Sequence, residues 1–164
     1  MAARKESDWG RLIVAVAALL AGGCFGPAES KYARQLVPAA GRISVGGQPL
    51  ADATVIFVPA DGGAGTVGAT AFTAADGRFK AITPLPNTDA SRCVGLIPGR
   101  YRVVLRKLAM PNGTPVPTDI EESEALARGA RNALPGRYGT AENTPLAVDV
   151  PEGGVESLDL EVTR

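Results

Sequence analysis

The feature that most constrains this chain is a series of short segments with the β-strand pattern, separated by stretches that contain glycine or proline. In the clearest, over residues 99–107, the apolar side chains of Tyr101, Val103 and Leu105 alternate with polar ones such as Arg102. Six further segments of this kind occupy residues 41–45, 53–58, 67–73, 78–82, 145–150 and 155–162. Seven short strands with turn signals between them are typical of two packed sheets. We therefore predict an all-β fold, a seven-stranded antiparallel β-sandwich.

The turns between these segments have a clear chemical basis. Gly46-Gly47 and Asp76-Gly77 are strong turn signals, since glycine adopts the positive φ angles that tight turns need. The 164 residues include 20 glycines and 13 prolines, which suits many turns rather than long helices. A hydrophobic content of 45% is enough to form a core.

Residues 110–143 interrupt the strand pattern with a Pro/Gly-rich excursion. Within it, residues 118–129 predict one short helix, with Thr118 as the N-cap, acidic residues in the first turn, and Arg128 followed by Gly129 at the end. An irregular connection of this length is uncommon in a compact domain and is usually functional or mobile.

The N-terminus has the pattern of an export signal. A basic region containing Arg4, Lys5 and Arg11 is followed by ten uncharged apolar residues at 12–21. That run is too short to cross a bilayer, which needs ~20 apolar residues. We predict that residues 1–23 are a signal peptide.

The end of that segment, Ala21-Gly22-Gly23-Cys24, resembles the lipobox of bacterial lipoproteins. The resemblance implies that Cys24 is lipidated and becomes the first residue of the mature protein. Ala21 occupies the position where leucine is favoured. Two alternatives stay open, namely an ordinary secretory signal with a chance cysteine, and a membrane anchor that is never cleaved.

These assignments predict the organisation of the chain. Residues 24–36 form a lipid-anchored tether and residues 37–164 the β-sandwich domain. The whole chain carries 17 basic and 17 acidic residues, so attachment to a membrane depends on the lipid rather than on net charge. Phe25 follows the cysteine where an aspartate would signal inner-membrane retention in some bacteria. We expect an exported protein, preferably on the outer membrane, with its domain in the periplasm or at the cell surface.

Several segments of the domain resemble carboxypeptidase regulatory-like domains. Residues 41–59 match their strand, G-x-P-L turn and second strand, and residues 73–79 match their T-D-x-D-G-x-F segment with Ala74 in place of aspartate. Residues 98–103 match their P-G-x-Y-x-V strand, and residues 144–150 a closing strand. The resemblance implies a transthyretin-like (prealbumin-like, Ig-like) sandwich, which is informative about fold and much less so about function.

The composition argues against several kinds of chemistry. The chain has no histidine, which removes the usual general base and the commonest zinc ligand. It has two cysteines and no long basic run, so neither a cysteine-rich metal site nor nucleic-acid binding is expected. We predict no catalytic residue, metal site or cofactor, and a protein that is not an enzyme.

Other candidate sites have simpler explanations. The loop aspartates could bind calcium but lack D-x-D-x-D spacing, and the acidic cluster near residue 122 suits a helix start. The arginines of residues 99–107 could form a basic stripe or a solvated face. These candidates are Asp61, Asp76, Asp89, Asp119, Glu121, Glu122, Glu124, Arg100, Arg102 and Arg106. Cys93, left alone if Cys24 is acylated, could pair between chains or be a buried thiol, and we favour burial.

The sequence therefore favours a membrane-anchored cell-envelope lipoprotein acting as a non-enzymatic structural or protein-interaction module. The alternative is a lipoprotein that binds a small ligand or glycan through residues 110–140. Expected partners are the membrane, through the lipid on Cys24, and envelope proteins or glycan.

Overall fold

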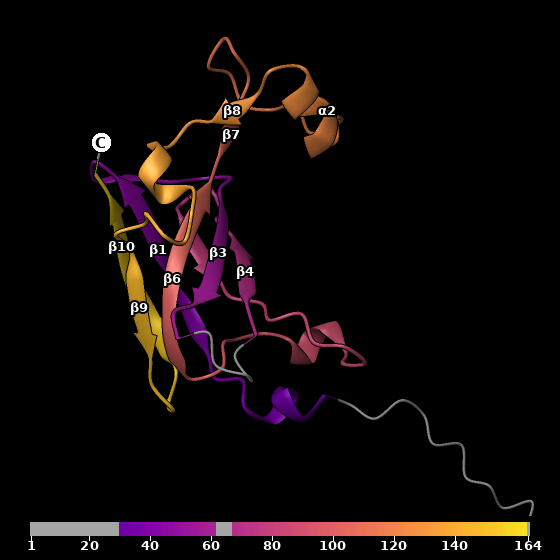
Figure 1. Cartoon of the computed structure of the whole chain (residues 1–164), viewed down its shortest axis with the longest axis vertical. Helices are drawn as coiled ribbons and strands as arrows, with labels where there is room; N and C mark the ends of the chain where they lie inside the picture. The colour runs from indigo at the N-terminus through magenta and orange to yellow at the C-terminus, as the bar shows by residue number, and fades with distance from the viewer. Residues whose placement is uncertain (1–29, 62–66, 164) are drawn as a thin grey trace, which may run out of the picture.

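The computed structural model describes residues 30–61 and 67–163, which fold into two packed β-sheets (Figure 1). One sheet has the order β10 (Val155–Val162), β1 (Ala39–Val45), β2 (Gln48–Pro49), with β5 (Arg78–Lys80) also paired to β1. The other has the order β4 (Ala69–Phe72), β3 (Thr54–Pro59), β6 (Gly99–Arg106), β9 (Ala147–Val150). A two-stranded sheet joins β7 (Leu108–Ala109) to β8 (Arg131–Asn132). The helices are η2 (Lys31–Arg34), η3 (Ala90–Arg92), α2 (Glu122–Ala127) and η4 (Gly136–Tyr138).

The predicted all-β sandwich is confirmed, and each of the seven predicted segments contains a strand. The described residues form ten strands rather than seven, because β2, β7 and β8 add two-residue strands that are too short to produce a sequence pattern.

One strand pair differs from the antiparallel expectation. The first and last long strands, β1 and β10, run parallel, with Ile43 opposite Leu160. An alternating pattern is the same for either direction, so the sequence could not distinguish them. The two backbones approach closely at a bulge, where a Cβ on Gly41 would lie 2.2 Å from the carbonyl oxygen of Leu158. Glycine is therefore required at this position.

The core consists of the inward-facing residues of the two large sheets. Tyr101, Val103 and Leu105 of β6 are fully buried, as their alternation predicted. The ring of Phe57 packs against Phe79 at 5.9 Å and, edge-on, against Tyr101 at 6.3 Å between centroids. Each such side chain contributes roughly 1.5–3 kcal/mol by its burial.

The helix within the excursion is shorter than predicted. It begins after Glu121, which makes no side-chain capping bond, so the prediction of Thr118 as N-cap is wrong. Residues 118–120 instead form turn and bend structure. The predicted end is confirmed, since Arg128 is the C-cap and Gly129 follows with φ of +92°.

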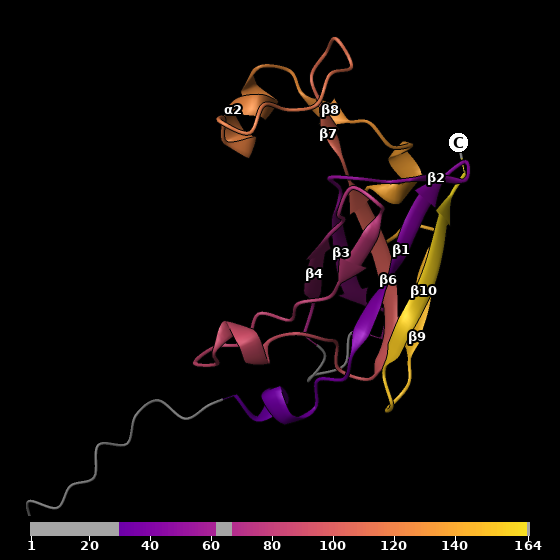
Figure 2. The same ribbon diagram turned by 180° about the vertical axis from the view of Figure 1, so that it is seen from behind.

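The beginning of the described chain and the excursion lie at opposite ends of the sandwich (Figures 1 and 2). η2 lies at one end, beside the loop that carries η3, whereas β7, β8 and α2 project from the other. The predicted tether, residues 24–36, thus includes a short helix. Within residues 30–61 and 67–163, no helix is long and apolar enough to cross a membrane.

Candidate functional site

The predicted lipidation site, Cys24, and the predicted signal peptide, residues 1–23, lie outside the described residues. Two regions of the described chain could carry function. One is the excursion, and the other is the tether root, which we define as residues 30–38 together with residues 93–96 to which they pair.

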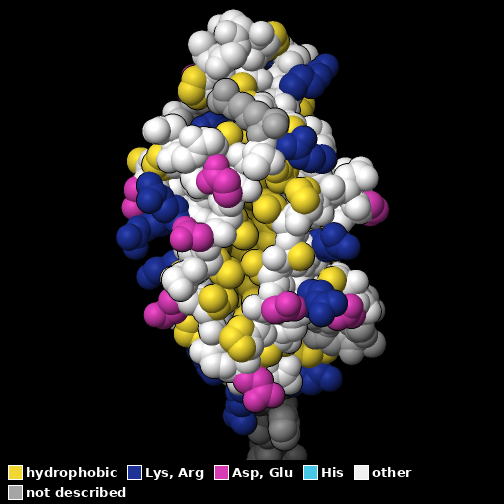
Figure 3. Space-filling view, turned by 90° about the vertical axis from the view of Figure 1, so that its left-hand side faces the viewer, with side chains coloured by type: hydrophobic (Ala, Val, Ile, Leu, Met, Phe, Trp, Pro, Cys, Tyr) yellow, Lys and Arg dark blue, Asp and Glu magenta, His cyan; other side chains and the backbone are white. Residues whose placement is uncertain are grey.

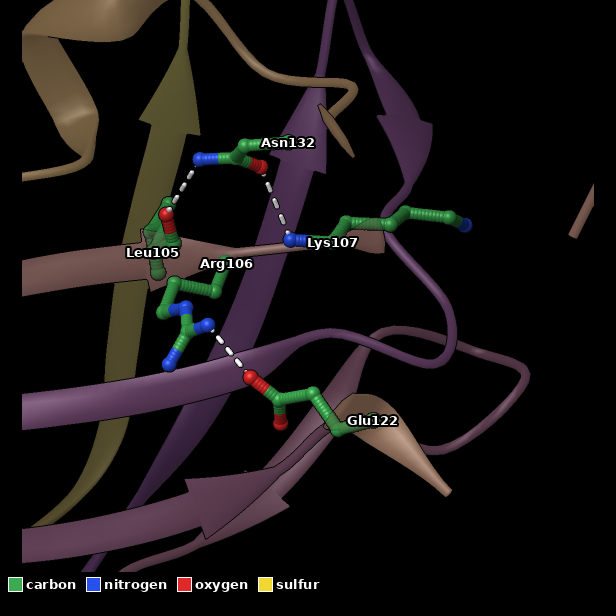
Figure 4. A network of polar contacts seen from close by, with 5 residues as sticks. All are labelled: Leu105, Arg106, Lys107, Glu122 and Asn132. Carbon is green, nitrogen blue, oxygen red and sulfur yellow. Dashed lines mark hydrogen bonds and ion pairs between the residues drawn. The ribbon is translucent and has the colours of Figure 1, made fainter. Parts of the chain in front are cut away.

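Asn132 fastens the excursion to the end of strand β6 (Figure 4). Its Oδ1 accepts a hydrogen bond from the backbone N–H of Lys107 at 2.9 Å, and its Nδ2 donates to the carbonyl of Leu105 at 3.1 Å. The backbone N–H of Ala133 also donates to the Lys107 carbonyl at 2.7 Å. The half-buried side-chain amide of Asn132 thus gives hydrogen-bond partners to backbone groups of Leu105 and Lys107 at the end of β6.

Two cationic side chains extend this attachment. Arg106 forms an ion pair with Glu122 of α2 (Figure 4), and the Nζ of Lys107 donates to the carbonyl of Ala51 at 2.7 Å. Arg106 and Lys107 also line a pocket of about 360 Å³ beneath the excursion, next to Thr54. Both cations already have partners, and the remaining polar side chains of the pocket are those of Asp52, Thr54, Thr118 and Glu122.

The returning end of the excursion is fixed by buried polar groups. The hydroxyl of Thr144 donates to the Val103 carbonyl at 2.6 Å and accepts from the N–H of Leu146 at 3.2 Å. Tyr138 is buried, and its hydroxyl oxygen accepts from the N–H of Thr163 at 3.0 Å. Hydrogen bonding to Thr163 lowers the pKa of Tyr138. Both ends of the excursion are therefore firmly held.

The segment between these ends is mostly exposed. Residues 111–124 are exposed apart from two half-buried positions, and α2 buries one side chain, Ala125. Leu126 is 41% exposed, which is unusual for a large apolar residue. The excursion is therefore a projecting and largely exposed surface.

At the other end, the tether root is built from backbone pairing. Val37 and Leu96 exchange two N–H to C=O hydrogen bonds, of 2.8 and 3.0 Å. Gly95 has φ of +119°, and a Cβ there would lie 2.3 Å from the Val37 carbonyl oxygen. This close approach fixes where the chain enters the fold.

Two of the four exposed large hydrophobic side chains among the described residues, Ile82 and Val94, lie close to this root, and a third, Phe72, lies further along β4, opposite Thr54. We call them the apolar row: Phe72 (70% exposed), Ile82 (42%) and Val94 (49%). Ile82 bridges to both Thr70 and Val94, so these residues share one face, and Phe72, two residues after Thr70, shares it too. The row therefore runs across the outer face beside β4.

A groove of about 550 Å³ lies beside Phe72 on the outer surface of β5, β1 and β10. Its walls carry Arg42, Arg78 and Lys80 on one side, and acidic residues of β10, including Asp159, on the other. Asp76 forms an ion pair with Arg78, and its carbonyl accepts from Arg42 at 3.0 Å. The groove is therefore charged, with its basic wall next to the apolar row.

A further apolar strip lies on the opposite side of the molecule, where β9 and β10 form the sheet edges (Figure 3). Val155 and Leu158 of β10 and Leu146 beside β9 are partly buried and pack against the core. This strip is thus a continuation of the core.

The arginines of β6 do not form a free basic stripe. Arg100 pairs with Asp149 at 3.1 Å, Arg102 donates to the Thr144 carbonyl at 3.3 Å, and Arg106 pairs with Glu122. The Asp149 carboxylate raises the pKa of Arg100. Each arginine thus fastens β6 to a neighbouring element.

The acidic candidates do not converge either. Within residues 30–61 and 67–163, no three Asp, Glu or Cys side chains form a group that could hold a metal. Asp89 caps η3 by accepting from the N–H and hydroxyl of Ser91, and these bonds lower its pKa. Glu124 pairs with Arg128 along α2. Cys93 is a free, buried thiol, as predicted.

Comparisons with known proteins identify no family for this chain. No family model matches it, and no curated protein matches it. A solved structure that it matches is a 9R-lipoxygenase from Cyanothece PCC8801, with 16% identity and a TM-score of 0.32. The match covers 96% of this chain but 21% of the lipoxygenase chain.

That comparison contradicts one prediction. The matched structure is an enzyme by its title, so the prediction that this protein is not an enzyme is withdrawn. With a TM-score of 0.32, the likeness assigns no activity to this chain either.

Sequence reasoning missed the residues that hold the two regions. A lone asparagine at position 132 and a threonine at 144 have no signature of their own, because their partners are backbone groups. The apolar row was also missed, since its members come from three separate segments that only the fold brings together.

Proposed function

We propose that this protein is an exported, lipid-anchored envelope protein whose β-sandwich presents the excursion to a protein partner. The anchor is the lipidated Cys24 that the lipobox-like sequence predicts. The single observation that carries the proposal is the position of the excursion at the end of the sandwich opposite the tether root (Figure 1). A module fixed at one end and exposed at the other suits recognition of a partner away from the membrane.

The way in which the excursion is held supports this proposal. Asn132 and Thr144 fix both of its ends, while the intervening residues remain exposed. An ordered loop loses less conformational entropy on binding than a mobile one. The cations of the pocket beneath it, Arg106 and Lys107, already make bonds that hold the excursion in place.

Photo-crosslinking in intact cells tests the proposal. A photoreactive amino acid at Leu126, the exposed apolar residue of α2, should give specific adducts of higher mass. The same amino acid at Glu156, an exposed position of β10, is the control. The Leu126 adducts should disappear when Asn132→Ala releases the excursion. Equal adducts at the two positions, or none at Leu126, would contradict the proposal.

The anchor is tested separately with Cys24→Ser. The parent chain should stay with membranes after a high-salt wash, and the variant should become extractable. A variant that remains in the membrane fraction would rule out the lipid as the attachment.

A further inference from the structure

One end of the apolar row, at Ile82 and Val94, lies beside the tether root, where the chain enters the fold. Backbone hydrogen bonds of 2.8 Å join Gly95 to Ala81 and Thr83 to Cys93, so the segments that carry Ile82 and Val94 form a ladder. Two residues after Val94, Leu96 pairs with Val37. The ladder thus connects the row directly to the start of the described chain.

The length of the preceding chain limits how far this region can lie from a membrane. Five residues separate Cys24 from Ser30, and the six residue steps from Cys24 to Ser30 span at most about 20 Å when extended. If Cys24 carries the lipid, as proposed above, the tether root stays within that distance of the bilayer. The inference below rests on that anchor.

The charges around the row favour an anionic surface. Lys80 lies on the basic wall of the groove beside Phe72, together with Arg78, which forms an ion pair with Asp76, and Lys31 and Arg34 are exposed on η2. Basic groups close to an anionic bilayer strengthen attachment to it. The acidic residues of the groove lie on β10, on the wall away from the row.

From these observations we infer that the apolar row rests on the surface of the bilayer that holds the lipid anchor. Phe72, Ile82 and Val94 insert among the lipid headgroups, and Lys80 and Arg78 lie against their phosphates. Apolar side chains flanked by basic ones are the combination that interfacial binding uses. The contact orients the domain on the bilayer surface.

Depth-dependent fluorescence quenching tests this contact on the full-length protein after processing. The protein is reconstituted through its own anchor into vesicles of phosphatidylethanolamine and phosphatidylglycerol that contain brominated lipid. A fluorophore is attached at Thr70→Cys, between Phe72 and Ile82 in register, or at Ala147→Cys, exposed at the opposite edge of the same sheet. Buried Cys93 should remain unlabelled, which the parent chain checks.

We expect several-fold stronger quenching of the Thr70 label than of the Ala147 label. The double variant Ile82→Ser/Val94→Ser should reduce the Thr70 signal to the control level while the protein still floats with the vesicles. Equal quenching at both positions in floating vesicles would overturn the inference. A Thr70 label that is shielded from water but not quenched by the brominated lipid would also overturn the inference, because a protein rather than the bilayer would then cover the apolar row. A parent chain that does not float would instead overturn the anchor, and flotation records this before any quenching is measured.

Discussion

The two ends of this sandwich are held by different kinds of interaction. At the tether root, backbone groups of Val37 and Leu96 pair with each other, and the close approach at Gly95 excludes any side chain. At the excursion, side chains make the attachment, chiefly Asn132 and Thr144. The tether root therefore requires that position 95 carry no side chain, whereas the excursion requires the polar side chains of Asn132 and Thr144.

The largest effect should come from Gly95→Ala at the tether root. The new Cβ meets the Val37 carbonyl and the residue keeps a positive φ, so we expect a loss of about 3 kcal/mol in unfolding free energy. Gly113→Ala in the excursion is the matched control, because Gly113 also has a positive φ (+83°) but nothing within 4 Å of its Cβ position. It should cost about 1 kcal/mol. If the two variants lose equal free energy of unfolding in urea, the close approach of Val37 to Gly95 does not contribute to the stability of the tether root.

At the excursion, Asn132→Ala should cost about 2 kcal/mol, because it leaves backbone groups of Leu105 and Lys107 without their partner. The effect should be local. Hydrogen exchange should speed up over residues 105–134 and remain unchanged in β1 and β10. Asn143→Ala, at an exposed position, is the control and should change stability by less than about 0.5 kcal/mol. Loss of protection throughout both sheets would show that the excursion is part of the core's cooperative unit.

Breaking the ion pair between Arg106 and Glu122 should have a smaller effect. Both side chains are largely exposed, at 41% and 57%, so Glu122→Gln should cost only a few tenths of a kcal/mol, and less in high salt. Unfolding at low and high ionic strength measures this. A loss comparable to that of Asn132→Ala would mean that the pair, rather than the amide, holds the excursion.

The smallest effect should come from Glu161, which fastens β10 to the turn after β1. Its carboxylate accepts from the Ser44 hydroxyl and from the Gly47 N–H at 3.0 Å, and these bonds lower its pKa below the ordinary 4.5. The ionised form therefore stabilises the fold above pH 4.5, and this contribution is lost as pH falls through the lower folded-state pKa. The parent chain and Glu161→Gln should differ in urea midpoint at pH 7 and converge as the pH falls below the folded-state pKa of Glu161. A constant difference at all pH values would show that the charge is not responsible.

The sequence predicts the sandwich well because its strands carry local signals. The alternation around Tyr101 and the turn at Gly77 each follow from neighbouring residues, and both are confirmed. The parallel pairing of β1 with β10 could not be predicted, since it joins residues more than a hundred positions apart.

The candidate site was less predictable. Thr118 has the chemistry of an N-cap, but the helix begins later, after Glu121, with no side-chain cap. Asn132 fixes the excursion through backbone partners about 25 residues away, and the apolar row joins three segments. Such contacts depend on tertiary structure and leave no periodic pattern in the sequence.

Mass spectrometry of the mature N-terminus from purified membranes tests the lipid anchor most directly. We expect a chain that begins at Cys24 and carries the added mass of two or three acyl chains. An unmodified Cys24, cleavage at another residue, or retention of residues 1–23 would contradict this expectation.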